Sequence, residues 1–296
     1  MASEILQTII AGMRAQNPLA SLDVFEMRAG MQAMEGQFQP PDDVRYESVS
    51  AGGVPAEWTV AEDSDATRAV VYLHGGGYTI GGLGSHRPLC TQLALAGRIP
   101  VLNVDYRLAP ENPFPAAVED AVAAYRYVLG RGVSPASVAI GGDSAGGGLT
   151  LATLAALSQA GDPLPGAGVC ISPWTDLTLT AETISSKAEE DPMVSGPLLE
   201  VMRDHYLGGA DPASPTASPL FADPSGWPPL LIQVGTAEIL LDDARRMAER
   251  ASAAGVEVAY EPWEEMIHVW HTLAPMLPEA TQAIERVAGF LSEKLD

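Results

Sequence analysis

Residues 139–148 read Ala-Ile-Gly-Gly-Asp-Ser-Ala-Gly-Gly-Gly, and this stretch decides the fold because it joins an apolar strand-like run to an apolar helix-like run. Gly142 and Gly146 have no side chains to collide with the neighbouring backbone, so the serine between them, Ser144, can occupy a sharp strand-to-helix turn. The helix that follows aims unpaired N–H groups and a positive dipole end at this turn. Ser144 is therefore a candidate nucleophile, and the alternative is a glycine-rich turn that merely contains a serine.

The remainder of the chain continues this alternation of strand and helix. From residue 69, short and almost continuous apolar runs are each followed by a loop and a helical stretch, a pattern typical of parallel strands buried on both faces. The ligand site of such a sheet belongs at the carboxyl ends of its strands, where Ser144 lies. The predicted strands are 69–73, 101–106, 137–142, 168–172, 230–235 and 256–260, after an antiparallel hairpin over 44–49 and 56–60; the predicted helices include 116–129, 148–159, 242–254 and 279–295.

Two segments stand outside this alternation. Residues 1–40 carry apolar side chains at three- and four-residue spacings, which predicts helices. Residues 176–222 hold no convincing buried strand, but they contain the run Asp191-Pro192-Met193, a helical stretch over 197–206 and a proline-rich return. An insertion of that length between two core strands is more typical of a lid than of a structureless loop.

The composition limits the compartment and the partners. Hydrophobic residues make up 47% of the 296, so the chain can bury a substantial core, and no apolar run approaches the roughly 18 to 20 residues of a membrane span. The first residues lack the basic region of a signal peptide, which makes a cytoplasmic location the default. Cys90 and Cys170 are far apart and fit reduced thiols. A net charge of −22 disfavours nucleic acid and anionic membranes as partners.

Serine is a weak nucleophile until a base removes its proton. Of the five histidines, His268 is the strongest candidate, because a short loop carries it from strand 256–260 to the same edge of the sheet as the candidate nucleophile. His86 and His205 have no predicted strand behind them. A metal site at His268 and His271 lacks a third ligand at a supporting spacing, so no metal is expected.

The acid that orients this histidine should lie at another strand end. Glu238 stands three residues beyond strand 230–235, whereas Asp242 and Asp243 are placed to start the following helix. Acids in a first helical turn are commonly caps or dipole partners. Glu238 is therefore favoured, and Asp242 remains the alternative.

A glycine-rich loop supplies donors for the negative charge that develops on a substrate oxygen in acyl transfer. His74-Gly75-Gly76-Gly77-Tyr78 directly follows strand 69–73, and its glycines let the backbone approach the substrate without side-chain obstruction. His74 is expected to orient this loop by hydrogen bonding. A phosphate loop is the alternative, but the run lacks the Gly-Lys-Ser/Thr ending of a P-loop, and no G-x-G-x-x-G occurs in the chain.

These residues, in the chain order Ser144, Glu238 and His268, resemble the hormone-sensitive-lipase family (bacterial family IV) of α/β-hydrolase carboxylesterases. Two further runs support the resemblance, Asp-Tyr-Arg-Leu-Ala-Pro-Glu at 105–111 and Asp-Pro-Met at 191–193. The resemblance implies an α/β-hydrolase fold, with a mostly parallel central sheet of about eight strands flanked by helices and a helical cap. It also implies a serine carboxylesterase that acts on small-molecule esters with short acyl chains and needs no cofactor.

The resemblance assigns a role to six positions: the catalytic residues Ser144, His268 and Glu238, and the oxyanion-hole donors Gly76, Gly77 and Ala145. The acid position of the family, often Asp-Pro-Leu, reads Glu238-Ile239-Leu240 in this chain. The longer side chain can still accept the imidazole N–H, but it requires a slightly retracted backbone.

The resemblance also divides the chain into a cap, residues 1–40 and 176–222, and a hydrolase core, residues 41–175 and 223–296. Related esterases often pair through edge strands, so a homodimer is a further expectation. The alternatives to an esterase are a catalytically weak ligand-binding protein of the same fold and a serine amidase or peptidase, which uses the same triad. The candidate substrate-pocket residues are Leu22, Phe25, Met27, Tyr78, Asp191 and Tyr206.

Overall fold

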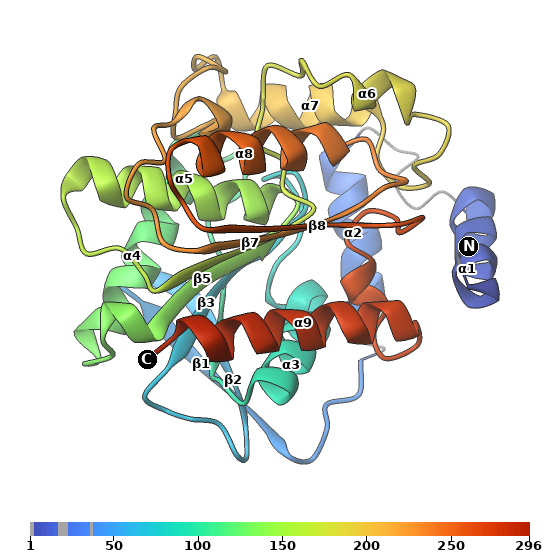
Figure 1. Cartoon of the computed structure of the whole chain (residues 1–296). Coiled ribbons are helices and arrows are strands. Elements are labelled where there is room, and N and C mark those ends of the chain that lie inside the picture. Colours follow the sequence, from blue (N-terminus) through green and yellow to red (C-terminus); the bar gives the residue numbers. More distant parts are fainter. Residues whose placement is uncertain (1–2, 17–22, 36–37) are drawn as a thin grey trace.

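The computed structural model describes residues 3–16, 23–35 and 38–296. Within them, eight strands form one sheet in the order β1-β2-β4-β3-β5-β6-β7-β8 (Figure 1). β2 pairs antiparallel with β1 and with β4, and every other pairing is parallel, which confirms the expected mostly parallel sheet. The strands are β1 (Val44–Ala51), β2 (Val54–Ala61), β3 (Ala69–Leu73), β4 (Val101–Val104), β5 (Val138–Asp143), β6 (Ala167–Ile171), β7 (Leu230–Gly235) and β8 (Val258–Trp263).

Helices cover both faces of this sheet (Figure 1). α3 and α9 pack together on one face, whereas α4, α5 and α8 cover the other. The side chains of β3 alternate between the two cores: Val70 and Tyr72 face α3 and α9, and Val71 and Leu73 face the opposite layer. Burial on both faces explains why the apolar runs are almost continuous. The helices are α1 (Glu4–Gln16), α2 (Val24–Glu35), α3 (Leu83–Gly97), α4 (Ala116–Gly130), α5 (Ala145–Ala160), α6 (Thr183–Ser186), α7 (Gly196–Leu207), α8 (Leu241–Ala253) and α9 (Pro278–Lys294).

Some elements differ from the sequence-based expectation. β8 occupies Val258–Trp263 rather than 256–260, because the N–H of Val256 donates to the carbonyl of Ala251 and closes the turn that ends α8. α5 begins at Ala145, three residues earlier than predicted, since its first turn runs through glycines that pack closely on their neighbours. The helical pattern does not indicate α3, whose buried face includes polar side chains and whose interior contains a proline.

The turn at Ser144 joins β5 to α5 with an unusual backbone. Ser144 has φ 54° and ψ −121°, a backbone conformation that residues other than glycine avoid unless surrounding contacts hold it. Its N–H donates to the carbonyl of Ile171 at 2.8 Å, and its own carbonyl accepts the N–H groups of Gly148 and Trp174, each at 3.0 Å. The end of β6 and the first turn of α5 therefore fix this residue.

The glycines beside Ser144 allow the end of β3 to approach the turn. A Cβ on Gly146 would lie 1.9 Å from the carbonyl oxygen of Leu73, and a Cβ on Gly142 would lie 2.3 Å from the same atom. Neither position can carry a side chain unless the backbone moves. This close approach brings the loop that follows β3 alongside Ser144.

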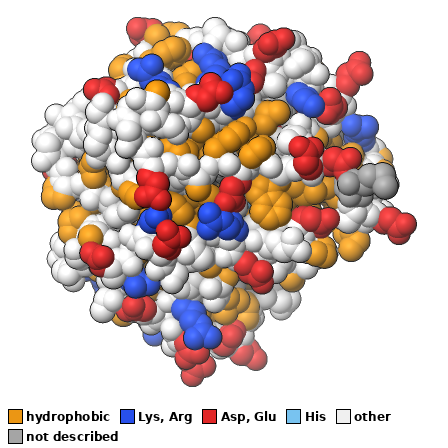
Figure 2. All heavy atoms as spheres, viewed as in Figure 1, with side chains coloured by type: hydrophobic (Ala, Val, Ile, Leu, Met, Phe, Trp, Pro, Cys, Tyr) orange, Lys and Arg blue, Asp and Glu red, His pale blue; other side chains and the backbone are white. Residues whose placement is uncertain are grey.

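Helices α2 and α7, which come from the two segments predicted to form a cap, pack on the core beside this loop. Leu198 and Met202 of α7 and Met27 of α2 belong to the same buried cluster as Tyr78, which follows β3. None of the described helices combines the length and the apolar character needed to cross a membrane. Both cysteines are buried and free. On the face seen in Figure 2, acidic side chains are spread over the surface, with arginines and lysines between them.

The packing around Ser144 predicts that Gly146→Ala destabilises the protein. The added methyl group would meet the carbonyl of Leu73, and overpacking of this kind costs about 1–3 kcal/mol or more in unfolding free energy. The urea midpoint of unfolding measures the change. The control is Gly289→Ala on α9, where nothing lies within 4 Å of an added Cβ and where alanine should stabilise the helix by up to about 1 kcal/mol. An undiminished midpoint for Gly146→Ala would contradict the packing.

Candidate active site

Ser144 is the partly exposed residue of an otherwise buried turn. Asp143 before it and Ala145 after it are both buried, so the turn presents the serine side chain at the surface of the sheet edge. Its left-handed backbone costs of order 1–3 kcal/mol, and such strain is characteristic of functional sites. The position suits a nucleophile that a substrate must reach.

The structure brings His268 and Glu238 into direct contact. Nδ1 of His268 lies 2.6 Å from Oε2 of Glu238, and both side chains are buried. Glu238 comes from the turn after β7 and His268 from the loop after β8, so two neighbouring strand ends supply the pair. An imidazole whose Nδ1 donates to a carboxylate has a fixed tautomer and leaves Nε2 available for proton transfer.

The second oxygen of Glu238 is also fully engaged. Oε1 accepts the N–H of Gly235 at 2.6 Å and the hydroxyl of Ser172 at 2.8 Å. A buried carboxylate is costly unless its oxygens are hydrogen-bonded, and here each oxygen has a partner. These bonds hold the carboxylate in the orientation that reaches His268.

Ser172, which the sequence analysis does not single out, connects the loops of the site. Besides binding Glu238, its hydroxyl accepts the N–H of Val269, the residue after His268, at 3.2 Å. Ile171, the residue before it, accepts the N–H of Ser144. Ser172 therefore lies between the serine and the histidine at one edge of the sheet. Its place at the end of the predicted strand 168–172 was the only signal in the sequence.

The alternative acid, Asp242, has a different partner. Its Oδ1 lies 3.0 Å from Nε of Arg245, within α8. Asp243 is buried and accepts the backbone N–H groups of Thr175 and Asp176, each at 2.9 Å, and burial raises its pKa to about 7. Asp242 thus pairs within α8 and Asp243 binds the loop after β6, and of these three acids the structure brings only Glu238 to His268.

The environment of His268 favours its charged form. Burial alone would lower the pKa of His268, but the charge of Glu238 and the hydrogen bond to it outweigh burial and raise the pKa above the ordinary value of 6.5. His271 differs, because its Nε2 bonds to Oε1 of Gln233 at 2.8 Å and burial lowers its pKa to about 3. The two histidines therefore have separate partners and separate titrations.

His74 has the orienting position that the sequence predicts. Its Nδ1 lies 2.8 Å from the carbonyl of Gly75, and its ring stacks on that of Tyr106 with centroids 4.2 Å apart. Burial, together with the neighbouring His86, lowers the pKa of His74 to about 3. His74 is therefore neutral near pH 7 and belongs to the support of the loop.

Asp143 ties the glycine loop to the nucleophile turn. Its Oδ1 accepts the N–H of Gly75 at 3.2 Å and the hydroxyl of Tyr72 at 2.8 Å, and its Oδ2 lies 3.3 Å from Nε2 of His86. Sequence reasoning missed this role, because the residue between Gly142 and Ser144 carries no periodic signal. Its contacts fix the start of the loop relative to Ser144.

Gly76 and Gly77 form the tip of this loop. Their φ values are 112° and 59°, and the carbonyl of Gly76 accepts the N–H groups of Thr79 and Ile80 at 3.0 and 2.9 Å. Within the described part of the chain, the N–H groups of Gly76 and Gly77 donate to no acceptor. Ala145 opens α5, where first-turn N–H groups lack an intrahelical partner. These three donors can therefore receive a substrate oxygen.

Among the pocket candidates, Tyr78 and Tyr206 lie together beside this loop. Their rings stack with centroids 3.7 Å apart and planes 7° apart, and both are buried. Met202 of α7 packs on Gly77 so closely that a Cβ there would lie 2.0 Å from its Sδ. Met27 of α2 is buried in the same cluster. Helices α2 and α7 therefore both pack close to the loop.

Phe25, another pocket candidate, lies at the surface of α2. Phe25 is 57% exposed, and the guanidinium of Arg28 lies 5.4 Å from its ring centroid, because α2 turns this residue outward. Leu22 lies outside the described residues.

Asp191 binds backbone rather than an open site. Its Oδ1 accepts the N–H groups of Met193 and Val194, each at 2.9 Å, and its Oδ2 accepts the N–H of Ile239 at 3.0 Å. Ile239 directly follows Glu238. The carboxylate of Asp191 therefore supports the loop of the predicted acid, which a sequence pattern cannot reveal.

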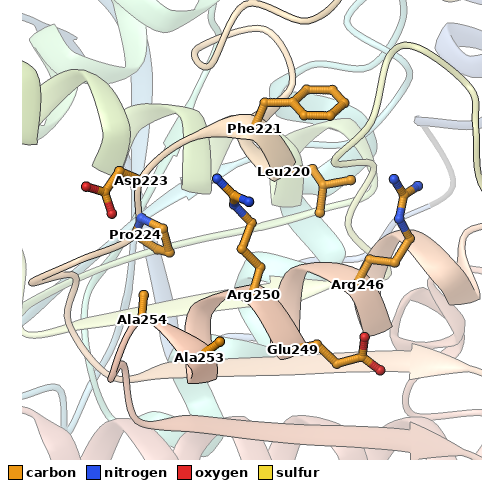
Figure 3. Close-up of a pocket in the computed structure, with 9 residues that line it drawn as sticks. All are labelled: Leu220, Phe221, Asp223, Pro224, Arg246, Glu249, Arg250, Ala253 and Ala254. Atoms are coloured by element: carbon orange, nitrogen blue, oxygen red, sulfur yellow. The ribbon is translucent and has the colours of Figure 1, made fainter.

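A surface groove of about 670 Å³ contains none of the predicted site residues (Figure 3). Arg246 and Arg250 extend into it from α8, but Arg246 bonds to Oδ2 of Asp176 at 2.9 Å and Arg250 to the carbonyl of Ala222 at 2.9 Å. These arginines tie α8 to its neighbours. The groove is lined by Leu220, Phe221, Asp223, Pro224, Arg246, Glu249, Arg250, Ala253 and Ala254.

Comparisons with known sequences identify the family and the fold. A family model described as the alpha/beta hydrolase fold matches residues 70–272. An acetyl-hydrolase of Streptomyces hygroscopicus is 48% identical over 252 residues, which cover 85% of this chain and 83% of that protein. An esterase of Acinetobacter venetianus is 38% identical over 248 residues, covering 83% of this chain and 82% of the esterase.

Solved structures are similar over the entire length. The crystal structure of an esterase from the bacterial hormone-sensitive lipase family has a TM-score of 0.96 and 46% identity, with 100% of both chains covered. A hormone-sensitive lipase from a metagenome library has a TM-score of 0.95 at 37% identity, again with 100% of both chains covered.

The contact between Glu238 and His268 predicts the effect of Glu238→Gln on the histidine. The amide retains an oxygen for the hydrogen bond but removes the negative charge of Glu238 that raises the pKa of His268, so this pKa should fall. An NMR titration of the imidazole measures this pKa. The control, Asp242→Asn, should leave it unchanged, since Asp242 pairs with Arg245. An equal response to both substitutions would refute the assignment.

Proposed function

Because this chain belongs to the bacterial hormone-sensitive lipase family of α/β-hydrolase esterases, we propose that it hydrolyses short-chain carboxylic esters through an acyl-enzyme on Ser144. His268 is the proposed base, and Glu238 is the acid that orients it. The observation that carries the proposal is the 2.6 Å contact between Nδ1 of His268 and Oε2 of Glu238, at the sheet edge where a strained turn presents Ser144.

Acylation begins when Oγ of Ser144 attacks the carbonyl carbon of the ester while Nε2 of His268 accepts the hydroxyl proton. Glu238 stabilises the imidazolium that forms, and the raised pKa of His268 favours that transfer. The imidazolium then gives its proton to the alkoxide oxygen as the bond between carbonyl carbon and alcohol breaks. The alcohol leaves, and the acyl group remains on Ser144.

The tetrahedral intermediate carries its negative charge on the former carbonyl oxygen. The N–H groups of Gly76, Gly77 and Ala145 are the proposed donors to that oxygen. Among the described residues the two glycine N–H groups have no other acceptor, so no existing bond must break when the charge develops. In enzymes of this kind, one such donor contributes about 2.7 to 4 kcal/mol to the stability of the transition state.

Deacylation repeats the same steps with water. Nε2 of His268 takes a proton from a water molecule as the water oxygen attacks the acyl carbon. The imidazolium then gives that proton to Oγ of Ser144 as the bond between Oγ and the acyl carbon breaks, which releases the carboxylic acid and restores the serine hydroxyl. The protein groups and water account for every proton and bond in the cycle.

The cap is part of the proposal. Residues 1–40 and 176–222 would cover a core made of residues 41–175 and 223–296. Met202 on Gly77 and the stacked pair of Tyr78 and Tyr206 fill the space beside the oxyanion donors with bulky side chains. This crowding supports a preference for short acyl chains.

Replacement of the nucleophile is the direct test. Ser144→Ala should lower kcat for p-nitrophenyl butyrate by roughly 10⁴- to 10⁶-fold, because no other group can form the acyl-enzyme. Steady-state kinetics measure the loss, and Ser158→Ala, an exposed position on α5, is the matched control. Near-normal turnover by Ser144→Ala would rule out the mechanism.

Substrate range is the second test. Across nitrophenyl esters from acetate to dodecanoate, kcat/KM should peak at short chains, and the matching short-chain anilide should be turned over far more slowly than the ester. A maximum at long chains would make the enzyme a lipase. Comparable rates on ester and anilide would instead indicate an amidase.

A further inference from the structure

We propose that Arg28, on the N-terminal helix α2, is a positioning residue for the proposed oxyanion-binding loop. It holds this loop in place by donating hydrogen bonds to two backbone carbonyls of the core. This inference rests on the proposed function of Gly76 and Gly77. It assigns to the N-terminal helix a part in transition-state binding in addition to covering the site.

Among the described residues, the guanidinium of Arg28 has four hydrogen bonds, all to the core. Its Nε donates to the carbonyl of Thr79 at 2.7 Å, and its Nη2 donates to the carbonyl of Ala109 at 2.7 Å. Its Nη1 and Nη2 also bind the two oxygens of Glu111, at 2.6 and 2.9 Å. A single side chain from α2 thus joins the glycine loop to the segment after β4.

Thr79 and Ala109 lie on either side of a bond that closes the loop. The N–H of Ala109 donates to the carbonyl of Tyr78 at 3.0 Å, and the N–H of Thr79 donates to the carbonyl of Gly76 at 3.0 Å. Arg28 donates to the carbonyls of Thr79 and Ala109, so it binds both segments that this hydrogen bond joins. Any displacement of Thr79 is passed directly to Gly76 through one hydrogen bond.

The loop needs such external support. Gly76, Gly77 and Tyr78 all have positive φ, at 112°, 59° and 62°, and none of them belongs to a helix or a strand. The left-handed conformation of Tyr78 is strained, because this residue, unlike glycine, carries a side chain. A loop without a regular hydrogen-bond ladder depends on contacts like those of Arg28 to remain in one conformation.

The carbonyl bonds, more than the ion pair, carry the effect. The side chains of Arg28 and Glu111 are 25% and 47% exposed, and ion pairs this open to solvent contribute little. The planar guanidinium, in contrast, presents donors in a fixed fork that spans two carbonyls and a carboxylate at once. A lysine has one nitrogen and cannot reproduce that geometry.

The chain offers a matched control in Arg14 of α1. Nη2 of Arg14 binds the carbonyls of Glu189 and Glu190, at 2.9 and 3.3 Å, so it also ties an N-terminal helix to backbone carbonyls. Those carbonyls belong to the 176–222 segment and not to the glycine loop. Loss of Arg14 therefore removes bonds between α1 and this segment but no bond to the glycine loop.

The experiment compares Arg28→Ala, Arg28→Lys and Arg14→Ala with the wild-type chain on p-nitrophenyl butyrate. An oxyanion hole acts in the transition state, so displaced donors should lower kcat rather than raise KM. We expect both Arg28 variants to lose kcat by about 10- to 100-fold with KM changed by less than about threefold. Arg14→Ala should retain kcat within about threefold of wild type.

A tetrahedral inhibitor gives a second readout. An alkylboronic acid that bonds to Ser144 mimics the tetrahedral intermediate. Its inhibition constant should rise in Arg28→Ala by about the factor by which kcat/KM falls. Circular dichroism confirms that each variant is folded, and Arg28→Lys carries the test alone if Arg28→Ala is not. Wild-type kcat in a folded Arg28 variant, a change in KM alone, or an equal loss in Arg14→Ala would overturn the inference. A wild-type chain inactive on esters would instead overturn the proposed function.

Discussion

The near contact between the carbonyl of Leu73 and Gly146 is the constraint on which the site depends. The end of β3 lies so close to the end of β5 and the start of α5 that neither residue 142 nor residue 146 has room for a methyl group. The glycine loop leaves β3 at that junction, and Ser144 leaves β5 there. Asp143 secures the joint by binding Gly75, so the proposed donors and the proposed nucleophile are placed relative to one another by packing and one carboxylate.

At the same edge of the sheet, hydrogen bonds offset the cost of burying the carboxylate of Glu238. Its oxygens accept bonds from Gly235, Ser172 and His268, and the ends of β6, β7 and β8 supply these partners. The glutamate side chain is long enough to return one oxygen to Gly235 at the end of its own strand while the other reaches the imidazole. This arrangement would allow a glutamate to act as the proposed acid, where the family often has an aspartate.

Much of the fold could be predicted because strands buried on both faces leave an unmistakable apolar pattern, and strand ends then place Ser144, Glu238 and His268 at one edge. The roles of Ser172 and Arg28 could not be predicted, since each depends on backbone groups that only the tertiary structure brings near. The exposure of the Phe25 side chain could not be predicted for a related reason. Helical spacing identifies the faces of α2, but not which residues at their margin remain exposed.

The bond from Asp191 to Ile239 has a consequence for how this architecture can be diversified. It makes the 176–222 segment a structural partner of the proposed acid's loop rather than an interchangeable module. At its far end, the hydroxyl of Ser218 accepts the N–H of Leu177 at 2.7 Å and so fastens the segment to itself. Chimeras with a relative's segment would therefore need crossover points between Asp191 and Ser218, so that both hydrogen bonds are kept when the sequence between them is exchanged.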